Sequence, residues 1–526
     1  MLRLIEMKKI IAFILGLILL FIPQNVSAVS SNFTTDYNVT YNVLENALTH
    51  VTFDIILTNQ TSQYYASSYS IQVGFNNINN VLASDSKGKI TPKITRNDDG
   101  NNIEIVFNDR VVGLGKKLNL TISFDTKDIA RMSGKIWDIN IPGIAKQAEY
   151  NSFNVNVIVP KFLENPSYIK PDTEQFSGTD LRFTKEQLGK SGISISYGQE
   201  EIYNFNLSYH LKNPNLFPIK AEIALPPSTN YQDVEIVDIN PKPQNITTDS
   251  DGNWLAKYDL GSSRKIDVKV NGRAKVLLRP KKQKLSQKER KEYLKEQPFW
   301  QTTDKRIKEL ALELKTPYKI YKYVVGNLKY DFQRLQTGMP RLGALGVLKN
   351  PSSAVCLEFT DLFIALARAA GIPAREVNGF AYTQNSKERP LSLVKDVLHA
   401  WPEYYDSDMQ TWVMVDPTWE NTTGGTDYFY TLDFDHLAFV IKGISSTYPI
   451  PAGAYKISNN QTARDVIVEF GNSFNKPFFL TNKADAIKIQ NNENFIGKVI
   501  LFVSIFIGLS VIACKTGYLL FFKRKR

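Results

Sequence analysis

Cysteine is nearly absent from this chain, which has two among its 526 residues. Cys514 lies inside an apolar stretch near the C-terminus, so Cys356 is the one thiol in the rest of the chain. Cys356 therefore cannot belong to a disulfide framework, and a single leftover cysteine of this kind is a candidate reactive thiol. The alternative is a small buried hydrophobic side chain, because free cysteine is often buried.

Several ligand-binding signatures are also missing. Basic residues at the two ends carry much of the formal net charge of +11, and no RNA- or DNA-binding motif is present, so nucleic acid is not an expected partner. The segment 249–253 has a glycine too early for a calcium-binding EF-hand loop, and we predict a hairpin turn there. No calcium or zinc ligand cluster stands out, so no metal and no cofactor are expected.

Both ends of the chain carry apolar runs. A basic start, an apolar run at 10–22 and small residues ending at Ala28 predict a secretory signal peptide at 1–28, with an uncleaved anchor as the alternative. A second apolar stretch is long enough for a bilayer and predicts a transmembrane helix at 495–522. The basic tail at 523–526 would stay in the cytoplasm. These features predict a single-pass protein of the cell membrane whose larger part lies outside the cytoplasm.

Between the predicted signal and residue 285, short segments alternate apolar and polar residues with a period of two. This pattern is typical of antiparallel strands with one buried face, and turn-rich sequences separate the segments. We predict two β-sandwich-like domains, at 29–165 and 166–285. The alternating segments are 37–43, 51–57, 118–124, 153–159, 203–209 and 266–270.

After residue 285 the pattern changes to mixed helix and strand. Thr303-Asp304 would cap a helix whose apolar residues recur at helical spacing. We place a mixed domain at 286–445 and a polar stalk at 446–494. The predicted fold class is thus multidomain: two antiparallel β-sandwich-like domains, an α+β core and one C-terminal transmembrane helix.

Cys356 falls at the start of a predicted helix. Apolar residues recur at helical spacing after it, Gly371 with Pro373 ends the helix, and Ser352 or Ser353 is the expected N-cap. The free N–H groups and the positive end of the helix dipole favour a thiolate at this position. The same N–H groups could stabilise an oxyanion.

A base and a carboxylate follow at suggestive positions. The segments 399–405 and 411–416 are predicted as two strands of a hairpin, in which His399 and Asp416 face each other across the turn. Asp416 would orient the His399 imidazole and fix its tautomer, and the other ring nitrogen would face Cys356. Taken singly, a histidine on a strand and an aspartate before a proline are commonly structural.

Four motifs between about 300 and 445 resemble the transglutaminase-like superfamily, in the expected order and spacing. The resemblance implies a papain-like α+β core and a catalytic triad of Cys356, His399 and Asp416. The motifs are Cys356-Leu357-Glu358-Phe359, 366–375, His399-Ala400-Trp401 and 415–419.

Two details of the resemblance concern neighbouring residues. The family often has glycine two residues before the nucleophile, and Ala354 stands there, where its methyl group could crowd an acyl substrate. Asp435-His436 resembles the family's closing segment, and we interpret His436 as structural. The second oxyanion donor is left open among three residues upstream: Tyr330, Gln333 and Gln336.

These observations predict an exported, membrane-tethered thiol enzyme acting on amide bonds of proteins or peptides. Cys356 would form a thioester with the acyl group of the substrate. Water would hydrolyse this thioester, or an amine would accept its acyl group, as in a cysteine peptidase, amidase or acyltransferase. The alternative is a catalytically inert surface adhesion or scaffold protein whose β domains bind a partner. The sequence does not predict the oligomeric state.

Overall fold

The computed structural model describes residues 32–474 except 98–99, 145–149, 164, 174–175, 189–191, 336–338, 384–388, 392–397, 431 and 455–463. These residues divide into two compact units. The first unit holds the described residues up to Asn42 and those within His50–Thr126 and Gln147–Val157, and the second unit holds the others.

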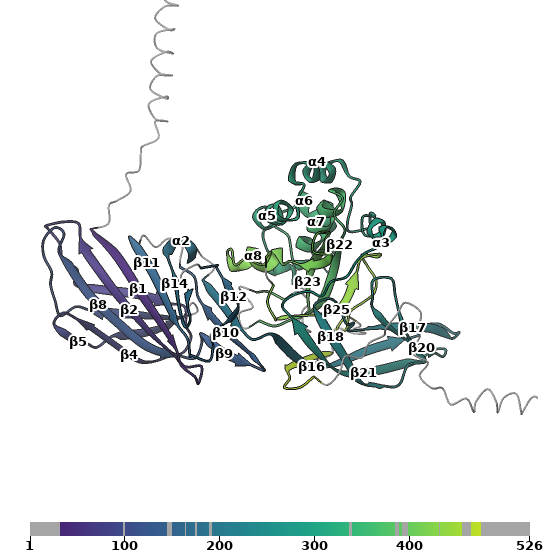
Figure 1. The fold of residues 1–526 in the computed structure, drawn as a ribbon, viewed down its shortest axis with the longest axis horizontal. Coiled ribbons are helices and arrows are strands. Elements are labelled where there is room, and N and C mark those ends of the chain that lie inside the picture. The colour runs from purple at the N-terminus through teal and green to yellow at the C-terminus, as the bar shows by residue number, and fades with distance from the viewer. Residues whose placement is uncertain are drawn as a thin grey trace, which may run out of the picture. The chain divides into compact units, whose positions relative to one another are not determined.

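The first unit is built from β-strands (Figure 1). Strands of its larger sheet are neighbours in the order β11-β1-β2-β8-β4-β5, and a smaller sheet has the order β3-β7-β6. Alternate residues of β2 are buried, among them Val51, Phe53 and Ile55, as the period of two predicts. The strands are β1 Phe33–Val43, β2 Thr49–Asn59, β3 Ser68–Val73, β4 Ile78–Asp85, β5 Gly88–Ile90, β6 Lys93–Asn97, β7 Gly100–Val106, β8 Lys117–Thr126 and β11 Ser152–Ile158.

The second unit begins with three further sheets. Their orders are β12-β15-β10-β9, β18-β21-β16-β26 and β17-β20-β19. The predicted turn at 249–253 is confirmed, since it joins the antiparallel pair β19 and β20. The elements are β9 Ala130–Ser133, β10 Ile136–Ile141, β12 Pro166–Lys170, β13 Phe176–Ser177, β14 Asp180–Phe183, α2 Lys185–Leu188, β15 Ile193–Tyr197, β16 Glu200–Lys212, β17 Ile219–Leu225, β18 Gln232–Asn240, β19 Asn245–Thr248, β20 Trp254–Leu260, β21 Lys265–Leu277 and β26 Val466–Phe470.

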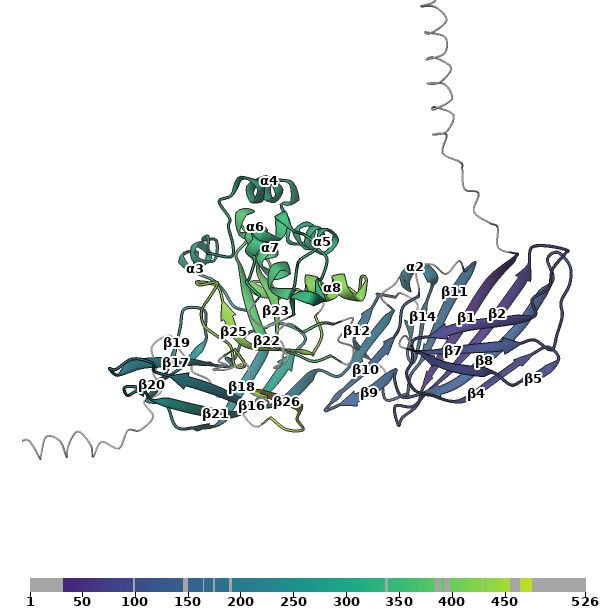
Figure 2. The ribbon, with the colours of Figure 1, turned by 180° about the vertical axis from the view of Figure 1, so that it is seen from behind.

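The rest of the second unit is a helical layer on a sheet of order β24-β23-β22-β25. Helices α4 to α7 gather over this sheet, and α7 packs against β22 and β23 (Figures 1 and 2). The predicted helix capped by Asp304 is confirmed as α4. The elements are α3 Gln287–Glu292, α4 Lys305–Leu314, α5 Pro317–Asn327, η1 Phe332–Arg334, α6 Gly343–Lys349, α7 Cys356–Ala369, β22 Ala374–Ala381, β23 Leu398–Asp406, β24 Thr411–Met414, α8 Pro417–Thr423 and β25 His436–Lys442.

Side chains from the preceding β region bind the backbone N–H and carbonyl groups of β25, as a neighbouring strand would. The Gln232 carboxamide accepts a hydrogen bond from the Ala438 N–H and donates one to the Ala438 carbonyl, each 2.8 Å long. The Asn253 carboxamide does the same with Ile441, at 2.7 Å in both directions. The Asp251 carboxylate accepts from two further N–H groups directly after the strand. Because buried backbone groups need partners, these contacts fix the strand that begins with His436.

The predicted fold class is wrong. The described chain is mostly β, with several sheets and a few helices, and Phe380, Leu398 and Leu437 of the site-bearing sheet share one hydrophobic core with the β16–β21 region. No helix among the described residues is long and apolar enough to cross a membrane. The prediction of a single-pass protein of the cell membrane is therefore not supported either. It rested on apolar length, which a spanning helix requires but which does not establish one.

Several predicted segments lie outside the described residues. They are the signal peptide at 1–28, the transmembrane helix at 495–522 and the basic tail at 523–526. Part of the predicted stalk is described, and its strand β26 pairs antiparallel with β16, with Phe205 opposite Val468.

Candidate active site

Cys356 is the first residue of α7 and is completely buried. The expected serine N-cap is wrong, because Val355 is the N-cap residue. Its N–H instead donates to the Glu358 carboxylate at 3.1 Å, and the Arg334 guanidinium pairs with the same carboxylate at 3.3 Å. The capping side chain is thus that of Glu358 in the first turn of the helix, and the N-cap residue itself supplies no capping side chain. The thiol lies at the positive end of the helix, where a thiolate is favoured.

His399 lies on β23, and two tryptophans hold its ring. The Trp419 and Trp401 rings stack on the imidazole with centroids 5.1 and 5.9 Å away. The imidazole Nε2 contacts Asp416 Oδ2 at 2.9 Å, and both side chains are fully buried. Stacking and burial restrict the imidazole to one orientation.

Asp416 reaches His399 by a different route from the predicted cross-strand pair. In the β23–β24 hairpin Glu403 lies opposite Met414, so continuing that register would place Thr418, and not Asp416, opposite His399. β24 ends at Met414, and Asp416 is the N-cap of α8. Its Oδ1 accepts from the N–H groups of Thr418 at 2.9 Å and Trp419 at 3.1 Å, which leaves Oδ2 for histidine.

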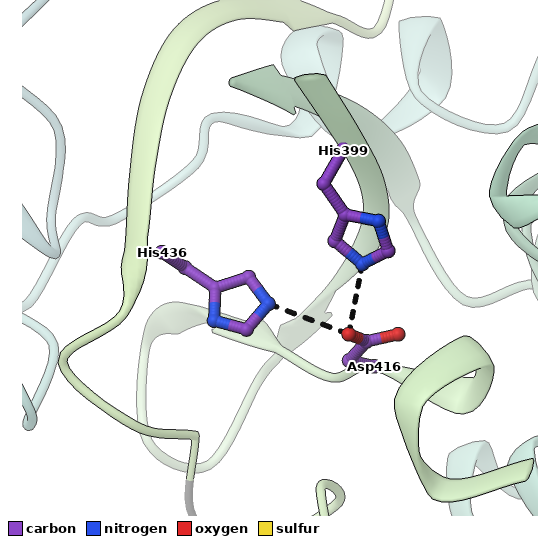
Figure 3. Close-up of side chains that lie close together, drawn as sticks. All are labelled: His399, Asp416 and His436. Carbon is purple, nitrogen blue, oxygen red and sulfur yellow. Dashed lines mark hydrogen bonds and ion pairs between the residues drawn. The ribbon is translucent and has the colours of Figure 1, made fainter. Parts of the chain in front are cut away.

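A second histidine shares the Asp416 carboxylate. His436 Nε2 lies 3.3 Å from Asp416 Oδ2, and His436 Nδ1 lies 2.7 Å from Asp433 Oδ1. Figure 3 shows the two imidazoles converging on one carboxylate oxygen. The sequence interpretation of His436 as merely structural overlooked this contact, and it missed Asp433. The Asp433-x-x-His436 spacing before a strand was the available signal.

The electrostatics follow from burying these charges together. Burial would lower the pKa of His399, but the Asp416 carboxylate and contact with Cys356 raise it to about 9. Since Nε2 bonds Asp416, Nδ1 is the nitrogen left for the thiol. Burial also opposes the charged form of His436, yet Asp433 and Asp416 raise its pKa to about 9. Against burial, His399 and His436 hold the pKa of Asp416 well below its usual range. Both imidazoles are therefore largely protonated at neutral pH.

Of the three residues left open as the second oxyanion donor, the structure brings Tyr330 near Cys356. It forms an isolated parallel bridge with Ala354, and the Asp331 N–H donates to the Ala354 carbonyl at 2.8 Å. Burial and then the nearby Cys356 raise the pKa of Tyr330, and its hydroxyl is shielded from solvent with no hydrogen-bond partner among the described residues. Gln333 is exposed, and Gln336 lies outside the described residues.

A metal ion is a second use to consider for the histidine pair. Ligand atoms of His399, Asp416 and His436 lie within 4.8 Å of one another. However, the Nε2 atoms of both imidazoles already contact the same oxygen of Asp416, and a metal ion bound through these nitrogens would have to replace both contacts. The arrangement fits the orientation of an imidazole beside a thiol better.

Comparison with known proteins gives the class of this site. Residues 301–417 match the Transglutaminase-like superfamily, a range that includes Cys356, His399 and Asp416. Over 85 residues the chain is 36% identical to a protein-glutamine gamma-glutamyltransferase from Pseudomonas aeruginosa, covering 15% of this chain and 13% of that protein. The chain thus matches only a small fraction of this relative's length.

Solved structures are less similar. A candidate cysteine protease from Cytophaga hutchinsonii is 18% identical with a TM-score of 0.32, over 55% of this chain and 95% of that one. Leukotriene A4 hydrolase from Saccharomyces cerevisiae is 13% identical with a TM-score of 0.23, over 32% of this chain and 30% of that one. The family match, and not these structures, shows that the chain contains a transglutaminase-like domain at residues 301–417, and it points to a cysteine-based enzyme that acts on amide bonds.

Proposed function

We propose that this protein is a cysteine enzyme that forms an acyl-thioester on Cys356 from amide groups of protein or peptide substrates. The observation that carries the proposal is the fully buried His399–Asp416 pair, in which His399 contacts Cys356, the only cysteine of the described residues, at a helix N-terminus. A structural cysteine needs neither an oriented imidazole nor a carboxylate behind it. This arrangement is the one that nucleophilic thiol chemistry requires.

The two half-reactions use the same groups in turn. The Cys356 thiolate attacks the amide carbon, and the His399 imidazolium protonates the leaving nitrogen as the C–N bond breaks and ammonia or an amine departs. Water or a primary amine then attacks the thioester, neutral His399 accepts its proton, and the C–S bond breaks. Water gives an acid by hydrolysis, and an amine gives a new amide.

The test is to incubate the full-length protein with casein, with and without a labelled primary amine, and to analyse the products by mass spectrometry. One of two parallel enzyme samples would first be alkylated with iodoacetamide, and the modified cysteine would be identified. We expect deamidation, cleavage or amine incorporation that disappears when Cys356 is alkylated and persists in EDTA. Reactions unaffected by alkylation would contradict the proposal. Amine incorporation would identify a transferase, and its absence would identify a hydrolase.

Tyr330 is proposed as an oxyanion donor beside the Cys356 N–H. Replacing Tyr330 with Phe should lower kcat by about 10²-fold, because one donor to the developing oxyanion is lost. Iodoacetamide alkylation of Cys356 generates no oxyanion, so its rate should not change. Tyr258→Phe, which removes a hydroxyl bonded to the Pro241 carbonyl, is the matched control. Equal losses in turnover and alkylation would show that Tyr330 only supports the fold.

His436 is proposed as a positioning residue that acts through Asp416. His436→Gln should lower kcat about tenfold, the effect of roughly 1.5 kcal/mol from one hydrogen bond to a charged group. Because the His436 cation would no longer repel the His399 imidazolium, the alkaline limb of the alkylation–pH profile should move upward from about pH 9. His210→Gln, which also removes a histidine between two aspartates, is the control. A lower kcat with an unmoved limb would assign His436 a purely structural role.

A further inference from the structure

A pocket of about 220 Å³ adjoins the candidate active site. Its lining includes Leu357, the residue after Cys356, and His399 with its neighbours Leu398 and Ala400. This volume is below the range of small-molecule sites and suits a single side chain. A substrate group in this pocket would lie beside Leu357 and His399, which adjoin or contact Cys356.

Sheet register explains why polar and apolar groups meet in the pocket. Asn378 lies opposite Ala400, and Glu376 lies opposite Lys442, so these side chains share one face of the sheet. Apolar residues from the segment after β25 also line the pocket. They are Ile450, Pro451 and Ala454.

The two solvent-accessible charged side chains that line the pocket, those of Arg341 and Lys442, are both cationic, and the His399 side chain has no solvent exposure. The carboxylates that balance them, Asp361 and Glu376, have no solvent exposure and lie behind this lining. An occupant therefore meets positive groups first. A carboxylate is attracted, and an ammonium group is repelled.

Arg341 and Lys442 differ in the hydrogen bonds that they have left to offer. Arg341 donates to both oxygens of Asp361, to Glu376 and to the Ser446 carbonyl, so its guanidinium is nearly saturated. The Lys442 ammonium has three donors and makes one long contact, 3.4 Å to Glu376 Oε1, among the described residues. Lys442 is 7% exposed. A buried ammonium with unused donors in a pocket is suited to bind an anionic ligand.

We propose that this pocket is a specificity subsite for an acidic side chain next to the reacting residue of the substrate, with the Lys442 ammonium as its hydrogen-bond donor. The proposal rests on the proposed function and narrows it to substrates with Asp or Glu beside the acyl-donor residue. The apolar walls contact the methylene groups of that side chain, and Lys442 binds its carboxylate.

The test compares short peptides that share one reactive glutamine and differ at the neighbouring residue, which is Glu, Gln or Lys, with both termini blocked. Wild type should prefer the Glu peptide over the Gln peptide by about tenfold in kcat/KM, as expected for a charge-assisted hydrogen bond. The Lys peptide should be the poorest substrate. In Lys442→Met, which keeps a long side chain without the charge, the Glu/Gln ratio should fall to about 1.

The ratio is measured within each variant, so a partly folded variant does not distort it. Lys322→Met is the matched control, because Lys322 also pairs with a buried carboxylate, that of Glu420, but does not line the pocket. It should keep the wild-type ratio. The carboxylate that Lys442 binds could come from an acidic side chain or from the C-terminus of a peptide. A fourth peptide, with a neutral neighbour and a free C-terminus, distinguishes these two sources. If the enzyme prefers this peptide over the Glu peptide, the assignment to an acidic side chain is overturned.

A second measurement does not depend on turnover. The Glu peptide should slow iodoacetamide alkylation of Cys356 in wild type and not in Lys442→Met, since the pocket adjoins both Leu357 and His399. Peptide turnover without acidic preference, or protection that survives Lys442→Met, would overturn the subsite while leaving the thiol enzyme intact. Acidic protection without any Cys356-dependent reaction would instead overturn the proposed function alone.

Discussion

Replacing Cys356 with alanine is expected to remove the amide-directed activity almost entirely, by about 10⁶-fold, the scale seen when a covalent nucleophile is deleted. The thiol supplies the only bond to the acyl group in the proposed reaction, and His399 cannot replace it because its Nε2 is held by Asp416. The measurement is single-turnover release of ammonia or amine from a glutamine peptide.

The fold should survive the substitution, because alanine at this fully buried position removes one sulfur atom and introduces no polar group. Thermal unfolding of Cys356→Ala should therefore lie close to that of wild type. Cys514→Ala is the matched control and should keep full activity. Residual activity in Cys356→Ala above about one per cent of wild type would show that another group performs the chemistry, and the triad assignment would fail.

The sequence was a good guide where local rules decide the structure. Alternating segments became strands such as β2 and β16, and the apolar spacing after Cys356 became α7. Asp304 caps α4 because its side chain bonds the Arg306 N–H two residues away. Each of these outcomes depends on residues within a few positions of one another.

The sequence was a poor guide where partners are distant. Val355 replaces the expected serine cap because Glu358 reaches back to its N–H and Arg334 fixes that carboxylate. The contact of His436 with Asp416 depends on where β25 lies, and Gln232 and Asn253, roughly two hundred residues earlier, hold that strand. No local pattern encodes such a contact. The same is true of Lys442, which among the described residues makes one long contact with Glu376, while Arg341 binds the other oxygen of that carboxylate.

Replacing Asp416 with asparagine is expected to lower kcat by about 10⁴-fold, because it would impose the wrong imidazole tautomer. The backbone N–H groups of Thr418 and Trp419 bind Oδ1, so the amide oxygen of the new side chain would stay there. Its NH₂ group would then occupy the place of Oδ2, 2.9 Å from His399 Nε2. That nitrogen would have to accept, which puts the proton of a neutral ring on Nδ1, the atom that faces the thiol.

The pH profile separates this effect from simple misfolding. In wild type, a His399 pKa of about 9 keeps the imidazolium beside the thiol until the pH rises through that value, so the alkaline limb of thiol alkylation should lie near pH 9. Without the Asp416 charge, burial is the dominant influence and disfavours the imidazolium, so the limb should move to lower pH. Asp267→Asn, which changes the carboxylate beside His210, is the matched control and should move neither kcat nor the limb. An Asp416→Asn protein that kept the wild-type limb would show that the carboxylate does not set the protonation of His399, and the orienting role would have to pass to the tryptophans that stack on the ring.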